Sequence, residues 1–109
     1  MTEITKTLIP EEQVLMQNPI DRWGQAWRNF MTEQHPEEIP ELKSNLKWEL
    51  IPRQIDREAW EMWELLRKQY AQAKPRPKTS FVEIERWERT RQLIVEHEVM
   101  EQIVLQYRG

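Results

Sequence analysis

The 109-residue sequence has no cysteine, two glycines, two histidines and no long apolar run. Without cysteine, the chain has no disulfides and no thiolate metal ligands. No segment approaches the roughly 20 apolar residues of a membrane-spanning helix, and the first residues lack the apolar core of a secretory signal. We therefore expect a cytoplasmic protein without membrane contact.

The scarcity of glycine and histidine also limits the available chemistry. Gly24 lies in a predicted helix and Gly109 ends the chain, so neither belongs to a phosphate-binding loop. Neither histidine follows a glutamate at the Glu-x-x-His spacing of dimetal bundles. We expect no enzyme activity, no cofactor, no metal and no small-molecule substrate. A metal site around His97, built from more than one chain, is the one enzymatic alternative that stays open.

What the sequence does contain is tryptophan and charge. It has 6 Trp, 39% hydrophobic residues and 32% charged residues. Aromatic side chains each bury a large apolar area when packed, which argues against a disordered chain. The length suits a single domain with one modest core. We therefore treat residues 1–109 as one folded helical domain.

Apolar spacing predicts an all-α bundle of three main helices, over about 19–34, 57–73 and 81–107. Asn18 and Pro19 are a favourable helix start, and the first helix carries Trp23 and Trp27 on one stripe. Asp56 is the predicted cap of the second helix. Ser80 and Glu83 form a capping box for the third.

The remaining segments are predicted to be less regular. Residues 1–18 read as an extended amino-terminal arm followed by a short helix from Pro10 to Gln17. Residues 36–52 contain three prolines and read as a connection with one helical turn, in which the alternation of residues 46–50 suits either a short strand or a helical turn. Residues 74–79 (KPRPKT) form a stiff, exposed, basic turn.

The last predicted helix changes its apolar face. At 100° per residue, Ile84, Trp87 and Ile94 lie on one side, whereas the apolar residues of its second half lie on the other. The short companions of this helix leave that second face uncovered, so we expect it to contact a protein partner or a second copy. The predicted interface consists of Leu65, Val99, Met100, Ile103, Val104 and Tyr107.

Charge is unevenly distributed. The net charge is -3, yet residues 65–82 contain five basic and no acidic side chains. These basic residues, Arg67, Lys68, Lys74, Arg76 and Lys78, are candidates for contact with a nucleic-acid backbone. Two roles thus remain open: a non-catalytic adaptor or scaffold subunit of a larger complex that uses the second half of its last helix, and a helical accessory subunit of a nucleoprotein complex.

Overall fold

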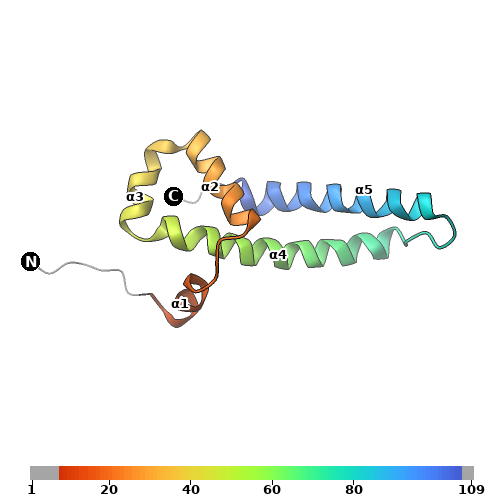
Figure 1. The fold of residues 1–109 in the computed structure, drawn as a ribbon, viewed down its shortest axis with the longest axis horizontal. Coiled ribbons are helices and arrows are strands. Elements are labelled where there is room, and N and C mark those ends of the chain that lie inside the picture. Colours follow the sequence, from red (N-terminus) through yellow and green to blue (C-terminus); the bar gives the residue numbers. More distant parts are fainter. Residues whose placement is uncertain (1–7, 107–109) are drawn as a thin grey trace, which may run out of the picture.

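The computed structural model describes residues 8–106 and is all-α, as the sequence predicts (Figure 1). This part of the chain has five α-helices rather than three main ones. They are α1 (Pro10–Met16), α2 (Arg22–Gln34), α3 (Ile39–Ser44), α4 (Lys47–Ala73) and α5 (Phe81–Val99). A short 3-10 helix, η1 (Pro36–Glu38), precedes α3, and a π-helical turn, η2 (Met100–Val104), follows α5. The predicted arm lies mostly outside the described residues.

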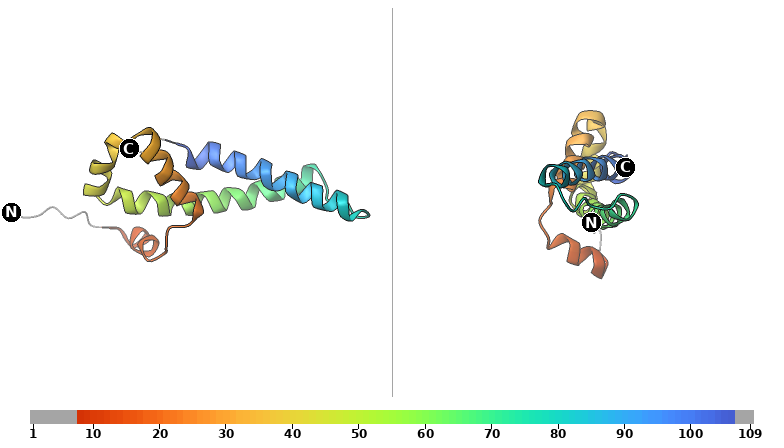
Figure 2. Two further views of the ribbon diagram at one scale, coloured as in Figure 1. Left: turned by 45° about the horizontal axis from the view of Figure 1, so that its top comes forward. Right: turned by 90° about the vertical axis from the view of Figure 1, so that its right-hand side faces the viewer.

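Helices α4 and α5 run antiparallel and side by side, and the other helices gather at one end of the pair (Figures 1 and 2). We call residues 8–59 and 95–106 the body, and residues 60–94 the hairpin. The radius of gyration is 18.0 Å, against about 13 Å for a compact domain of this length. The hairpin accounts for this excess, because it projects from the body without a third helix beside it.

The core lies entirely in the body. It is built from α2, α3, α4, α5 and η2, and its fully or nearly fully buried side chains are Trp23, Trp27, Met31, Leu42, Ile51, Ile55, Ala59, Val95, Val99 and Val104. Helices pack against this region from three directions, so each of these side chains is covered on all sides. Both tryptophans predicted on the first helical stripe belong to this core.

The start of the first main helix differs from the prediction. Helix α2 begins at Arg22, and its N-cap is Asp21, whose carboxylate accepts a hydrogen bond from the Arg22 amide at 2.7 Å. Asn18 and Pro19 instead belong to the linker between α1 and α2. Asp21 is the cap because it lies three residues further along the chain than Asn18, directly before the buried stripe. The predicted short helix from Pro10 is confirmed as α1.

The prediction for residues 36–52 is wrong. There is no strand at residues 46–50. Instead the segment forms η1, α3 and the first turns of α4, which begins at Lys47 rather than after Asp56. Leu46 precedes α4 with a φ of 66°, so this one left-handed residue makes the sharp corner between α3 and α4.

Pro52 sits inside α4 instead of ending a connection. A proline there removes the hydrogen bond to the carbonyl four residues earlier, that of Trp48. The Arg28 guanidinium of α2 replaces it, because its Nη2 and Nε donate to the Trp48 oxygen at 2.7 and 3.2 Å. The same guanidinium pairs with Glu49 at 3.0 Å. A donor from another helix therefore allows α4 to continue through its proline.

The last helix does not run to Tyr107 as one α-helix. It ends at Val99 and continues as η2, in which the Leu105 amide donates to the Met100 carbonyl, a spacing of five residues. A π-turn holds more residues than an α-turn, so it shifts the apolar register. Val95, Val99 and Val104, spaced by four and then five residues, all reach the core. The predicted change of face in this segment is therefore absent.

Candidate functional site

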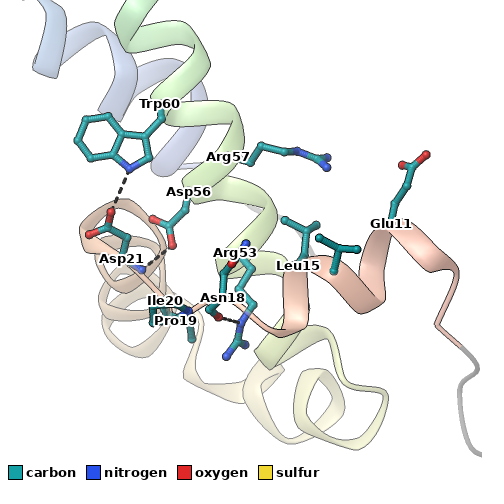
Figure 3. A pocket seen from close by; sticks show the side chains of 11 residues that line it. Glu11, Leu15, Asn18, Pro19, Ile20, Asp21, Arg53, Asp56, Arg57 and Trp60 are labelled. Atoms are coloured by element: carbon teal, nitrogen blue, oxygen red, sulfur yellow. Dashed lines mark hydrogen bonds between the residues drawn. The ribbon is translucent and has the colours of Figure 1, made fainter.

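A cleft between α1 and α4 and a groove along the hairpin are both open enough to bind another molecule. The cleft measures about 840 Å³. Its apolar walls come from α1, the linker and α4, and Figure 3 shows its side chains. They are Glu11, Val14, Leu15, Asn18, Pro19, Ile20, Asp21, Arg53, Asp56, Arg57 and Trp60.

The floor of the cleft is the joint between α2 and α4. Asp56, a buried residue of α4, accepts hydrogen bonds from the backbone amides of Asp21 at 2.6 Å and Gly24 at 2.7 Å. It thus caps α2, whereas the sequence suggested that it caps its own helix. Burial raises the pKa of the Asp56 carboxyl above its ordinary value of 3.8. The hydrogen bonds from Asp21 and Gly24 act in the opposite direction and offset only part of this increase.

The joint also explains why residue 24 is a glycine. A Cβ atom at this position would lie 2.4 Å from the Pro52 carbonyl oxygen and 2.8 Å from Oδ2 of Asp56. Helices α2 and α4 therefore cross at a distance that admits no side chain. The close crossing in turn brings the Gly24 amide within reach of Asp56.

Three polar side chains of the cleft, those of Asp21, Arg53 and Asp56, hold the fold together. The Asp21 carboxylate accepts a second hydrogen bond, from Trp60 Nε1 at 3.1 Å (Figure 3). Arg53 donates to the carbonyls of Asn18 and Glu49 at 2.7 and 2.6 Å. No serine, threonine, cysteine or histidine lines the cleft. The arrangement joins helices and offers an apolar hollow, and it lacks a nucleophile with an activating base.

No group of three carboxylate or histidine residues in the described part of the chain is placed to hold a metal ion. His97 lies 3.9 Å from Glu101 on the exposed side of α5 and η2. Between residues 8 and 106, no helix has both the length and the apolar character needed to cross a bilayer.

The hairpin differs from the body in its interior. None of the residues 60–94 is fully buried. Aromatic rings and guanidinium groups make up part of this interior: Tyr70 of α4 packs against Trp87 of α5. Within each helix an arginine stacks on a tryptophan, Arg67 on Trp63 at 4.3 Å and Arg91 on Trp87 at 4.5 Å. The side chain of Arg91 is only 12% exposed and pairs with Glu88 at 2.9 Å. These stacks keep charge where a bundle normally has aliphatic residues.

A groove of about 240 Å³ runs along one side of the hairpin. Leu66, Gln69 and Tyr70 of α4 form one wall, and Ile94, Val95 and Glu98 of α5 form the other. Leu65 stands one turn before Gln69 on the edge of the same wall, since residues four apart share a helix face. Leu65 is 54% exposed and Ile94 44%. We call this surface the hairpin groove.

The predicted interface residues are therefore not brought together. Val99 and Val104 are completely buried in the core, and Met100 and Ile103 pack against it. Helices α2 and α4 cover this end of the chain, so the reason for placing an interface there is removed. Leu65 alone is exposed, and it lies on the hairpin. Tyr107 lies outside the described residues.

The predicted basic residues divide into two groups. Lys74 and Lys78 are exposed at the tip of the hairpin. Arg76, also at the tip, pairs with Glu88 at 3.3 Å. Arg67 is held on Trp63, and Lys68 is exposed further down α4. The tip is closed by a hydrogen bond of 2.8 Å from Trp87 Nε1 to the Lys74 carbonyl.

Sequence reasoning missed the role of Ile94 and Leu66 in the groove. Both lay on the stripes assigned to a buried core, and no local signal separates a core stripe from one that lacks a covering helix. Comparison with known proteins adds no further guide: no family model, no curated protein and no solved structure matches this chain.

Proposed function

We propose that this chain is a non-catalytic interaction subunit that binds a helical protein partner in the hairpin groove. The role is the one that the sequence predicts, moved from the end of the last helix to the middle of the α4–α5 pair. The observation that carries it is the complete lack of buried side chains in residues 60–94, beside a core that is well closed elsewhere.

Two helices alone cannot enclose a core, because their contact has only one line of facing residues. Four apolar side chains line the hairpin groove, namely Leu66, Tyr70, Ile94 and Val95, and Leu65 stands at its edge. Leu65 and Ile94 are each about half exposed. A helix laid into such a groove covers both walls at once, with anchors spaced at i, i+3, i+4 and i+7. The groove therefore suits an amphipathic helix better than an extended peptide or a small molecule.

Photo-crosslinking at single positions tests this proposal. A photoreactive amino acid in place of Leu65 is expected to give a covalent adduct with a polypeptide when the protein is produced in cells. The same group in place of Leu93, which is 62% exposed on the outward side of α5, is the matched control and is expected to give none. Equal labelling from both positions, or none from either, contradicts the proposal.

A second candidate role is contact with a nucleic-acid backbone through the hairpin tip. The favouring observation is that Lys74, Arg76 and Lys78 lie together on an exposed turn. Replacing the three residues with glutamine is expected to lower retention of nucleic acid and to flatten its salt dependence by roughly one charge per lost contact. Unchanged retention would exclude this role.

A further inference from the structure

We propose that the occupant of the hairpin groove is a second copy of this chain, packed antiparallel about a two-fold axis. In this dimer the basic tip of each hairpin lies on the acidic end of the other copy's groove. The inference rests on the proposed function and specifies its partner.

The first argument is the separation of charge. The hairpin carries eight basic and five acidic side chains, and the rest of the chain carries eight basic and fourteen acidic ones. The molecule thus has a positive hairpin and a negative body. A head-to-tail contact between two copies brings opposite charges together, whereas a side-by-side parallel contact opposes like charges.

The second argument is the symmetry of the groove itself. On α4 the groove is centred between Leu66 and Tyr70. Lys74 stands about 10 Å after this centre, at 1.5 Å per residue. The Lys74 ammonium group lies 5.9 Å from the Tyr70 ring centre, which places it at the tip end of the groove. A two-fold axis through the centre therefore sets the tip end of one copy, with Lys74, against the body end of the other copy's groove.

Glu98 is the acidic side chain at the other end of this surface. It lines the groove on α5 at the end near the body, opposite the tip that carries Lys78. The contact is self-complementary: each copy offers an acidic end, an apolar middle and a basic end in that order. Such an arrangement is what an isologous two-fold interface requires.

The available area suits a dimer of moderate strength. The overlapping part of each hairpin measures roughly 25 Å by 20 Å, from the helix rise and the usual spacing of packed helices. This is on the order of 500 Å² of projected surface per copy, close to the lower limit for stable interfaces. We therefore expect a dimer that dissociates in the micromolar range and weakens as salt screens its charged ends.

Charge reversal at the two ends tests the proposal. One variant carries Glu98→Lys, and a second carries Lys74→Glu and Lys78→Glu. Arg76 and its partner Glu88 stay unchanged. Sedimentation velocity and light scattering over a series of concentrations are expected to show a wild-type dimer and a roughly 100-fold higher dissociation constant for each variant, because like charges then meet twice across the axis.

Mixing the two charge-reversed variants tests whether the basic tip of one copy faces the acidic groove end of the other. Equal amounts of the two variants are expected to form a heterodimer, since the reversed tip of one meets the reversed groove end of the other. A chain with all three substitutions is expected to recover the homodimer. A wild type that is monomeric at every concentration, variants that stay dimeric, or a mixture without association would each overturn the proposal.

A single cysteine provides a measurement that does not depend on the charged variants. The natural chain has none, so Gln69→Cys beside the proposed axis is expected to form an intermolecular disulfide rapidly on mild oxidation. Leu93→Cys is the control on the outward face, and equal rates at both positions would contradict the dimer. If Leu65 crosslinks to a different protein while the purified chain stays monomeric, the proposed function holds and this inference fails.

Discussion

The same two helices behave differently in the two parts of the molecule. In the body, α4 and α5 contribute Ile55, Ala59, Val95 and Val99 to a core that is closed to solvent. In the hairpin, the continuation of these helices buries no side chain completely. The sequences of the two stretches have similar apolar spacing, so the difference comes from what covers them.

The covering elements are α2 and η2. Trp23 and Trp27 enter from α2, and Val104 enters from η2, so the body has packing from a third direction. The hairpin has a third element only at its base, where Trp60 packs against Trp23 of α2, and beyond that α4 faces α5 alone. Its side chains adapt to partial exposure by stacking guanidinium groups on indole rings, which tolerates water at the edges. We infer that burial in a helical pair depends on the third element rather than on the stripe itself.

The largest expected effect on stability is the difference between replacing Trp27 in the body and replacing Trp63 in the hairpin. Trp27 of α2 has no exposed surface, and Trp63 of the hairpin is half-buried. We expect Trp27→Ala to lower the free energy of unfolding by about 3 to 5 kcal/mol, because it leaves a cavity in a closed core. Trp63→Ala is expected to cost about 1 to 2 kcal/mol. Denaturant unfolding at low protein concentration measures both, and equal losses would remove the contrast.

A smaller effect is expected from removal of the donor that supports Pro52. Arg28→Met keeps the length of the side chain but leaves the Trp48 carbonyl without its hydrogen bonds, which is expected to cost about 1 to 3 kcal/mol. The hairpin offers a matched control in Arg89→Met, since Arg89 forms an exposed pair with Glu85 at 3.0 Å. That change is expected to cost less than about 0.5 kcal/mol. Similar losses from both arginines would contradict our account of the helix through Pro52.

The smallest expected effect is a pH dependence at the joint. Burial raises the pKa of Asp56 in the folded chain, so folding favours its protonated form. The resulting stabilisation is fully present below pH 3.8 and is lost as the pH rises through the raised pKa. Asp56→Asn does not titrate at this position. We expect the stability of the wild type relative to this variant to fall as the pH increases over that window.

Chemical denaturation of both proteins at a series of pH values measures this difference. The remaining carboxyl groups are common to both chains, so their contributions largely cancel in the comparison. A relative stability that rises with pH would mean that the hydrogen bonds from Asp21 and Gly24 outweigh burial in setting the pKa of Asp56.

Local patterns were sufficient for the helical class and for several boundaries. Ser80 caps α5 as predicted, with its hydroxyl accepting from the Glu83 amide at 3.3 Å. The two prolines of residues 74–79 do separate α4 from α5. These features depend on residues within one turn of each other, so the sequence contains all the information they need.

Features that depend on distant residues could not be predicted. Pro52 looked like the end of a connection, because nothing near it in the chain supplies the missing donor; Arg28 is 24 residues away. The π-turn at residues 100–104 was also invisible to a count of 100° per residue, so the burial of Val104 could not be predicted. Val99 precedes this turn, and it is buried because it packs in the core with residues of other helices. Among the predicted interface residues that the structure describes, Leu65 alone is exposed.

The sequence by itself determined that the chain is helical, where its hairpin turns, and that one of its segments is strongly basic, because these properties follow from residue type and short-range spacing. The tertiary structure alone decided which apolar stripes are covered. Burial is a property of neighbours in space, and the crossing of α2 over α4 at Gly24 encloses the stripes of one end and leaves those of the hairpin open.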